Sequence, residues 1–340
     1  MAKYSRVVIS RFGGPEVLEV VDDELREARQ GEVRVKVLAA GVSWVERMMR
    51  HGSYPGQPKP PFTPGYDMVG VVDQRGPGTS RVAEGQRVAA LLVHGGYAEY
   101  VFLPEDELVP VPAGVDPAEA VCLVLNYVTA WQMLHRVAAL QSGQSALVHS
   151  AAGGVGTAFL ELARLIRDGE TGVTVYGTAS AAKHELVTRL GGHPIDYRNV
   201  DFVERIREVT GPGVDAAFDP VGGGHWLRSR KCLRPGGLLV AYGSQSGVAG
   251  GLAAMSKDIV SAVTAMILPG RRFKFYSITS MKKAHPSWFR EDLTALFDLL
   301  ASGEVHPVIM ARVPWKDVRR AHELLEQNAV QGKLVLTFPP

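Results

Sequence analysis

The chain has 340 residues, of which 46% are hydrophobic and 21% charged, and its formal net charge is +2. At ~100–200 residues per domain this length predicts two domains, and the composition is that of an ordinary globular protein. Because the charge is nearly balanced and no dense basic block is present, nucleic acid is not an expected partner. The only cysteines, Cys122 and Cys232, exclude a disulfide framework and a thiolate zinc cluster, which fits a reducing compartment.

The sequence indicates neither a signal peptide nor a membrane span. Its first residues, MAKYSRVVISRF, lack the apolar core of a signal peptide. The longest uncharged apolar run, Ile259–Leu268, has ten residues. A membrane helix needs about 20. We therefore expect a cytoplasmic protein.

The first third of the chain, from Lys3 to about Cys122, has the pattern of short strands and turns rather than helices. Glu32–Leu38 alternates apolar and polar residues as a half-buried strand does, and Met68–Val72 and Gly95–Val101 also resemble strands. Tyr54–Pro64 contains five prolines in eleven residues and is predicted to be a loop, since proline lacks a backbone donor. The pattern predicts a β-rich first domain.

Helical spacing begins near Asp116, a predicted N-cap, and covers Pro117–Leu125 and Tyr127–Leu140. Alternating strand and helix patterns follow, which predict a parallel sheet covered by helices. These segments are Ala146–His149, Ala158–Ile166, Val173–Tyr176, Ala181–Leu190, Ala216–Asp219, Trp226–Leu233, Leu238–Tyr242, a long helix at Leu252–Leu268 and a last strand at Phe273–Ile278.

The C-terminal part is predicted to return to the first domain. Its pattern is helix, strand, helix, strand, at Glu291–Ala301, Val308–Val313, Lys316–Asn328 and Lys333–Phe338. We therefore predict a β-rich domain from residues 1–125 and 279–340, and a doubly wound α/β domain from residues 126–278.

The stretch Ser145–Thr157, SALVHSAAGGVGT, joins a short apolar run to a glycine-rich turn that opens into a helical pattern. Such glycines let the backbone approach a diphosphate, and the helix N-terminus offers free N–H groups to the anion. The spacing is a variant of the dinucleotide fingerprint with Ala151 at the first glycine position. We expect the cofactor to contact Ala152, Gly153, Gly154, Val155 and Gly156.

Motifs along nearly the whole chain resemble the zinc-free, zeta-crystallin-like quinone oxidoreductases of the medium-chain dehydrogenase/reductase superfamily. They are FGGPEVL (12–18), AAGVSW (39–44), PFTPGYDMVGVV (61–72), AEGQRVAAL (83–91), NYVTAW (126–131) and HSAAGGVG (149–156). YGTASAAKHE (176–185), HPIDYR (193–198) and DPVGG (219–223) resemble the vesicle amine transport protein group. The resemblance implies a GroES-like catalytic domain, a Rossmann domain and an active site between them. It also implies hydride transfer from NADPH to a quinone or an α,β-unsaturated carbonyl compound, in a homodimer.

Zinc is not expected. Alcohol dehydrogenases of the superfamily carry a cysteine and a His-Glu pair where this chain has Ser43 and Tyr66-Asp67. A hydroxyl and a phenol are poor zinc ligands. His94 and His149 are then expected to be loop or packing histidines.

NADPH is favoured over NADH because Val173–Ala182, which includes the end of the second Rossmann strand, lacks the acid that holds an NAD ribose. The segment instead offers Thr178 and Ser180 and leads to Lys183, which suits a 2′-phosphate. Tyr197, further along the chain, is also expected to contact the cofactor. Arg198 is left open between phosphate contact and solvated side chain.

The resemblance points to Ser43 and Tyr54 as donors to the oxygen on which negative charge develops. With a reference pKa near ~10, Tyr54 would be protonated at neutral pH, although it could serve only as an aromatic lid. Met48 replaces a tyrosine of some relatives. Further expected cofactor contacts are Asn126, Thr129, Gly243, Ser244, Asn328 and Lys333. Asn126 could instead cap a helix, Thr129 could serve packing, and Lys333 could begin an exposed strand.

Two other functions remain open at this point. One is an enoyl reductase that acts on a carrier- or CoA-linked acyl thioester. The other is a non-catalytic NADPH-binding adaptor. A short-chain dehydrogenase and a serine hydrolase are disfavoured, since the sequence has no Tyr-x-x-x-Lys pair and no G-x-S-x-G elbow.

Overall fold

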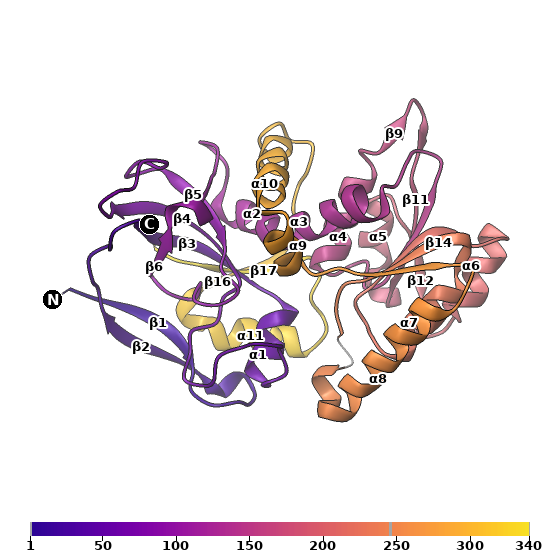
Figure 1. The fold of residues 1–340 in the computed structure, drawn as a ribbon, viewed down its shortest axis with the longest axis horizontal. Helices are drawn as coiled ribbons and strands as arrows, with labels where there is room; N and C mark the ends of the chain where they lie inside the picture. The colour runs from indigo at the N-terminus through magenta and orange to yellow at the C-terminus, as the bar shows by residue number, and fades with distance from the viewer. Residues whose placement is uncertain (1, 245–246, 340) are drawn as a thin grey trace. The chain divides into compact units, whose positions relative to one another are not determined.

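A computed structural model describes residues 2–244 and 247–339, with residues 247–255 described by their backbone alone. The chain divides into a terminal unit, Met1–Val128 with Trp288–Pro340, and a central unit, Thr129–Ser287. Each unit is built around its own β-sheet (Figure 1). Among the described residues, no helix is both long enough and apolar enough to cross a membrane.

The central unit contains a six-stranded sheet in which all neighbouring strands are parallel. In spatial order the strands are β12 (His193–Asp196), β11 (Thr174–Ala179), β8 (Ser145–Val148), β13 (Val214–Asp219), β14 (Leu233–Ala241) and β15 (Arg272–Phe275). Counted along the chain, this is the order 3-2-1-4-5-6 of a Rossmann fold. The predicted doubly wound sheet is confirmed.

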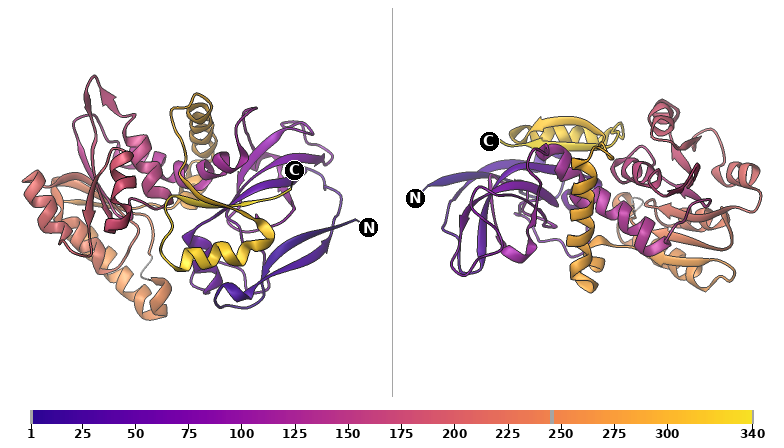
Figure 2. Two further views of the ribbon diagram at one scale, coloured as in Figure 1. Left: turned by 180° about the vertical axis from the view of Figure 1, so that it is seen from behind. Right: turned by 90° about the horizontal axis from the view of Figure 1, so that it is seen from above.

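Helices connect these strands and cover both faces of the sheet (Figures 1 and 2). They are α4 (Gly154–Ala163), α5 (His184–Arg189), α6 (Phe202–Thr210), α7 (Gly224–Lys231) and α8 (Gly247–Ile267), with α9 (Ile278–Ala284) after the last strand. Right-handed crossovers place α4 and α5 on one face and α6, α7 and α8 on the other. A short hairpin, β9 (Arg167–Asp168) and β10 (Thr171–Gly172), extends from the loop after α4.

Helix α6 is absent from the sequence-based prediction. Its signal is a local cap, because the Asp201 carboxylate accepts hydrogen bonds from the backbone N–H groups of Val203 and Glu204. Its inward residues, Phe202 and Ile206, join the buried apolar cluster of the central unit. The helix has nine residues, and its apolar residues Phe202, Val203, Ile206 and Val209 recur at helical spacing, so α6 could have been predicted from the sequence.

The terminal unit contains a seven-stranded sheet and a separate hairpin of β1 (Lys3–Ile9) and β2 (Leu18–Glu24). The sheet strands are, in order, β16 (Ile309–Pro314), β17 (Lys333–Thr337), β3 (Glu32–Val42), β4 (Asp67–Arg75), β5 (Arg87–Leu91) and β7 (Val109–Pro110), with β6 (Tyr100–Pro104) also paired to β3. Because β17 pairs antiparallel with β3, strands from the first and last parts of the chain share one sheet.

Helices of the terminal unit are α1 (Trp44–Arg50), α2 (Pro117–Cys122), most of α10 (Pro286–Ala301) and α11 (Val318–Glu326). Asp116 caps α2 as predicted, accepting from two backbone N–H groups. After α2 the helix continues through π-helical turns and α3 (Val128–Trp131) to Ala138.

Helix α1 corrects the expectation that no helix precedes Cys122. A capping box starts it, in which the Ser43 side chain and the Glu46 side chain each bond the other's backbone. The capping box begins one residue after β3 ends, and α1 has only seven residues, so the spacing of apolar residues does not distinguish the helix from the strand before it.

Candidate functional site

The glycine loop of the central unit follows β8 and opens into α4. Its backbone folds so tightly that a Cβ on Gly156 would lie 2.4 Å from the Ser150 carbonyl oxygen. A Cβ on Gly177 of the neighbouring strand would lie 2.6 Å from the Ala151 Cβ. Gly153 is the N-cap of α4, so the N–H groups of the first turn that have no partner within the helix belong to Gly154, Val155 and Gly156. This cradle fits the diphosphate of a dinucleotide.

The predicted 2′-phosphate residues lie at the ends of β11, which pairs with β8, and of β12, which pairs with β11. Ser180 is the N-cap of the short helical turn Ala181–Lys183, and it accepts a bond from the Lys183 backbone at 2.8 Å. Burial lowers the pKa of Lys183, and so does the positive charge of Arg198. Arg198 follows β12 and lies over the ring of Tyr197, which is exposed. Two cations from neighbouring strand ends thus repel each other, an arrangement that an anion would stabilise.

Thr178, at the end of β11, is buried rather than open to solvent. Its Oγ1 lies 3.0 Å from His149 Nδ1. His149 is itself fully buried next to Asp219 and His225, so it lies in the core rather than in an exposed loop. Sequence spacing could not reveal this group, because its members follow different strands.

In the terminal unit, the predicted donor Ser43 is committed to Glu46. Its Oγ lies 2.5 Å from Glu46 Oε2, which also accepts from the Ser43 backbone at 2.9 Å. Tyr66 donates its backbone N–H to the other Glu46 oxygen at 2.9 Å. Burial raises the pKa of Glu46, and the charge of Asp67 raises it further. When Glu46 is ionised, the Ser43 hydroxyl donates its proton to the Glu46 carboxylate and not to a substrate. The role of Ser43 as a donor to substrate stays a prediction.

The predicted donor Tyr54 is paired with a second tyrosine. Its hydroxyl lies 2.9 Å from the Tyr66 hydroxyl, and the two rings meet edge to face at 6.0 Å. Tyr66 is buried, whereas Tyr54 is partly exposed. Burial raises the pKa of Tyr54, which keeps it protonated at neutral pH. When Tyr66 donates within the pair, the Tyr54 proton can go to an acceptor. Sequence reasoning considered Tyr66 only as a missing zinc ligand.

The loop that carries Tyr54 is fastened to α1. The backbone N–H of Tyr54 donates to Gln57 Oε1 at 3.0 Å, and Gln57 Nε2 donates to the Met49 carbonyl at 3.1 Å. Ser53 Oγ donates to the carbonyl of Met48 at 3.2 Å. The position of the tyrosine therefore depends on the position of α1.

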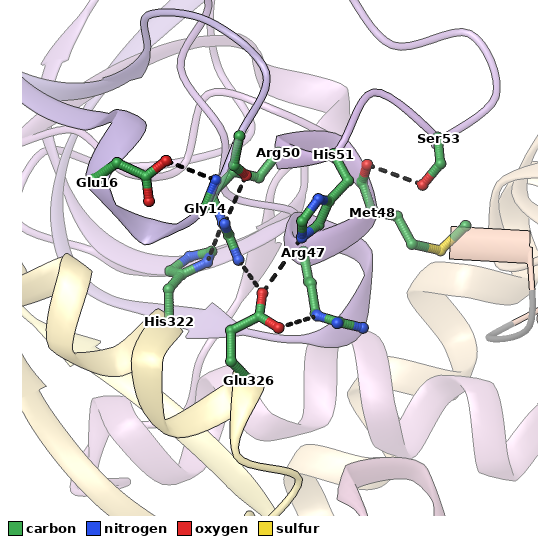
Figure 3. Close-up of polar contacts among 10 residues, drawn as sticks. Gly14, Glu16, Arg47, Met48, Arg50, His51, Ser53, His322 and Glu326 are labelled. Carbon is green, nitrogen blue, oxygen red and sulfur yellow. Dashed lines mark hydrogen bonds and ion pairs between the residues drawn. The ribbon is translucent and has the colours of Figure 1, made fainter. Parts of the chain in front are cut away.

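Helix α1 is in turn held by a buried arginine (Figure 3). Arg50 donates to the Gly13 carbonyl at 2.7 Å, to Glu326 Oε1 at 2.5 Å and to His322 Nδ1 at 3.3 Å. Arg47 donates to the other Glu326 oxygen at 2.8 Å. Glu326 and His322 belong to α11, so this group joins α1 to the C-terminal helix.

Asp67, one of the residues at which the resemblance led us to expect no zinc ligand, forms a buried ion pair. Lys333 Nζ lies 2.9 Å from Asp67 Oδ2, and both side chains are buried. Asp67 Oδ1 accepts from the Gly41 backbone at 3.0 Å. With the carboxylate neutralised by an ammonium, and Ser43 and Tyr66 as neighbouring hydroxyls, the donor set does not fit zinc. Lys333 begins a buried strand, not an exposed one.

The remaining predicted contacts occupy both units. Asn126 is buried in the terminal unit and Thr129 is buried in the central unit, on one continuous helix. Gly243-Ser244 follows β14, and the Ser244 hydroxyl donates to the Asp258 carboxylate of α8. Asn328 follows α11 with a left-handed φ of 53°. Their contacts to a cofactor stay predictions.

Comparisons with known proteins find relatives along nearly the whole chain. Residues 29–113 match the family described as alcohol dehydrogenase GroES-like domain, and residues 190–336 match the family described as zinc-binding dehydrogenase. The synaptic vesicle membrane protein VAT-1 homolog of Danio rerio is 33% identical, over 99% of this chain and 70% of that protein. Quinone oxidoreductase 1 of Escherichia coli is 31% identical, over 98% of this chain and 99% of that protein. The crystal structure of Escherichia coli quinone oxidoreductase complexed with NADPH superposes with a TM-score of 0.86 at 29% identity, covering 98% of this chain and 100% of that one.

Proposed function

The chain belongs to the medium-chain dehydrogenase/reductase superfamily, among VAT-1 homologues and quinone oxidoreductases, and we propose that it is an NADPH-dependent reductase of quinones or α,β-unsaturated carbonyl compounds. The superfamily consists of oxidoreductases. The observation that carries the cofactor proposal is the glycine cradle with two cations at the neighbouring strand ends, Lys183 and Arg198.

NADPH differs from NADH by one phosphate on the adenosine ribose, and the residues around the end of β11 favour that phosphate. Lys183 follows this strand and Arg198 follows the next. Their positive charges repel each other, so an anion bound between them would stabilise both charged side chains. The acid at the end of β12, Asp196, is occupied by its own turn, since it accepts from the Arg198 backbone and from Asn199 Nδ2. It therefore does not compete for a ribose hydroxyl.

Lys183→Ala tests the cofactor proposal. A charge-assisted hydrogen bond is worth about 1.5–3 kcal/mol, so we expect NADPH to bind roughly 10–100-fold more weakly while NADH binding changes little. Lys231→Ala, an exposed lysine of α7, is the matched control and should leave both affinities unchanged. Equal losses for the two cofactors would show that Lys183 does not contact the phosphate.

The proposed reaction adds a hydride to an electron-poor C=C bond or quinone and a proton from solvent to the reduced product. The nicotinamide supplies the hydride when the cofactor is bound. Negative charge develops on the acceptor oxygen, and Tyr54, paired with Tyr66, offers an O–H donor to it. Such an acceptor is already polarised, so the chemistry depends chiefly on positioning.

A steady-state screen of NADPH oxidation against quinones, enals and enoyl thioesters tests the acceptor class. We expect turnover of quinones or enals, and Tyr54→Phe should reduce kcat by well under the ~10²–10⁴-fold expected for loss of a general acid. Turnover of saturated aldehydes alone would contradict the proposal. NADPH binding without turnover of any acceptor would support the non-catalytic adaptor, and turnover of thioesters alone would support the enoyl reductase.

We further propose that this activity needs no zinc, since Asp67 is paired with Lys333 at the position of the metal in alcohol dehydrogenases. Metal analysis of the purified protein should find less than one zinc per chain, and a chelator should not reduce turnover. One tightly held zinc per chain whose removal abolishes turnover would refute this.

A further inference from the structure

Five polar side chains of the central unit, four of them buried and His225 partly exposed, form a hydrogen-bonded chain at the carboxyl ends of three neighbouring strands. His149 follows β8, Thr178 lies in β11, Asp219 ends β13, and His225 and Ser229 belong to α7. Ser229 Oγ lies 2.9 Å from His149 Nε2 and 2.6 Å from Asp219 Oδ2. His225 Nδ1 lies 2.7 Å from the same Asp219 oxygen. With His149 Nδ1 at 3.0 Å from Thr178 Oγ1, the contacts run without a break from β11 to α7.

The order of these contacts fixes the direction of each hydrogen bond. Hydrogen bonds from His225 and Ser229 help to keep the pKa of Asp219 low despite burial, and the Val221 backbone also donates to it, so the carboxylate only accepts. The single Ser229 proton then goes to Asp219, and Ser229 accepts from His149 Nε2–H. Burial lowers the pKa of His149 to about 3, so its ring is neutral and Nδ1 accepts from the Thr178 hydroxyl.

These same three strand ends surround the place where a Rossmann fold binds its dinucleotide. The strand order reverses between β8 and β13, and the glycine loop leaves the sheet directly after His149. Its first residue, Ser150, has a left-handed φ of 56°, and the Ala151 backbone donates to the Thr178 carbonyl at 3.1 Å. A non-glycine residue in that conformation is strained and needs support from its surroundings.

A metal ion is the other chemistry that this cluster suggests, since ligand atoms of His149, Asp219 and His225 lie within 4.8 Å of one another. However, the Ser229 hydroxyl lies among these atoms and already bonds two of the three groups. Each of the three groups therefore has a protein partner, and a cation would have to displace the hydroxyl. The observations favour a hydrogen-bonded network.

We propose that His149 and Ser229 are positioning residues for the dinucleotide, which hold the ends of β8, β11 and β13 and so set the geometry of the glycine loop. They act on cofactor affinity through the loop and do not contact the reacting atoms. The inference rests on the proposed NADPH function. It also assigns the Thr178 proton to His149, so that Thr178 has no proton to donate to a phosphate.

The test compares two variants that each lose one serine hydroxyl. Ser229 bonds groups at the carboxyl ends of β8 and β13, and Ser145 bonds across their amino ends. Ser229→Ala removes the link between His149 and Asp219. Ser145→Ala, at the amino end of β8, removes the bond from Ser145 Oγ to Asp215 Oδ2, 3.3 Å long, and is the matched control. Affinity for NADPH is measured by fluorescence titration of the intact protein, and kcat is measured at saturating NADPH with an acceptor that wild type reduces.

We expect Ser229→Ala to raise the Kd of NADPH about 3–10-fold, with kcat changed less than about twofold, because one net hydrogen bond is lost at a distance from the chemistry. Ser145→Ala should leave Kd within about twofold of wild type, even if both variants melt earlier. His149→Leu should raise Kd similarly, and the double variant with Ser229→Ala should lose less than the product of the two effects, since both break one chain of bonds.

Three results would overturn the inference. One is an unchanged Kd in both Ser229→Ala and His149→Leu; if Ser229→Ala fails to fold, His149→Leu alone decides. The second is an equal rise in Kd for Ser145→Ala. The third is one metal ion per chain whose removal by a chelator weakens NADPH binding, which would assign the cluster to a metal. Absence of NADPH binding by wild type would instead refute the proposed function.

Discussion

Two buried histidines, one in each unit, predict that the protein loses stability as the pH falls below about 6.5. His149 in the central unit and His322 in the terminal unit are buried. Burial lowers the pKa of each imidazole from 6.5 to about 3. Between these values the unfolded chain binds a proton that the folded chain does not, so protonation favours unfolding throughout this window.

The magnitude follows from the linkage relation. Between about pH 7.5 and about pH 5.5, a histidine with pKa values of about 6.5 unfolded and about 3 folded changes the free energy of unfolding by about 1.4 kcal/mol. Two such residues contribute about 3 kcal/mol, and Glu46, whose pKa burial raises, acts in the opposite direction because the folded state then binds its proton more readily. Asp219 and Glu326 have lowered pKa values and act in the same direction as the histidines, but unfolded carboxyls titrate near ~4, below this interval.

Urea unfolding at the two pH values, followed by fluorescence and circular dichroism, measures the effect. If the two units unfold in separate transitions, each should lose about 1.4 kcal/mol on acidification. His322→Leu should remove that loss from the terminal unit and leave the loss of the central unit intact. An equal free energy of unfolding at both pH values, or a His322→Leu variant as sensitive to pH as wild type, would refute the reasoning.

Two further substitutions test the loop and the anchor of α1. Gly156→Ala places a Cβ 2.4 Å from a backbone oxygen, so NADPH should bind more than about tenfold more weakly, whereas Gly224→Ala, with open space at its Cβ, should bind normally. Comparable affinities in a fluorescence titration would contradict the cradle. Glu326→Gln leaves the fully buried Arg50 without its carboxylate and should cost about 1–3 kcal/mol of unfolding free energy, below the ~3–5 kcal/mol of a fully buried pair because Glu326 is partly exposed. Glu323→Gln, an exposed site on the same helix, should cost under about 1 kcal/mol in the same urea titration, and equal costs would show that Arg50 does not depend on the carboxylate.

Local patterns let the sequence determine the architecture of the central unit. Ser145–Thr157 contains strand, turn and helix start within one short stretch, and the repeated strand–helix alternation permits few arrangements other than a parallel sheet. The absence of Asp and Glu from Val173–Ala182, at the end of the second Rossmann strand, can likewise be seen within one short segment. The capping box of Ser43 and Glu46 was also readable as S-x-x-E, so α1 could have been predicted from the sequence.

The pairs that define the candidate sites could not be read in this way, because they join residues whose separation along the chain carries no period. Lys333 meets Asp67 only because β17 pairs with β3 beside β4. Arg50 meets Glu326 because α11 packs on α1.

His149 shows the division most clearly. Its place directly before the glycine loop is set by a few neighbouring residues, and the sequence alone determined it. Its partners Ser229 and Asp219 come from later elements, and they reach it because the fourth Rossmann strand crosses over to lie beside the first. Backbone geometry over a few residues produces patterns that can be read in the sequence. Contacts between residues far apart in the sequence depend on the order and register of the strands, which only the tertiary structure decided.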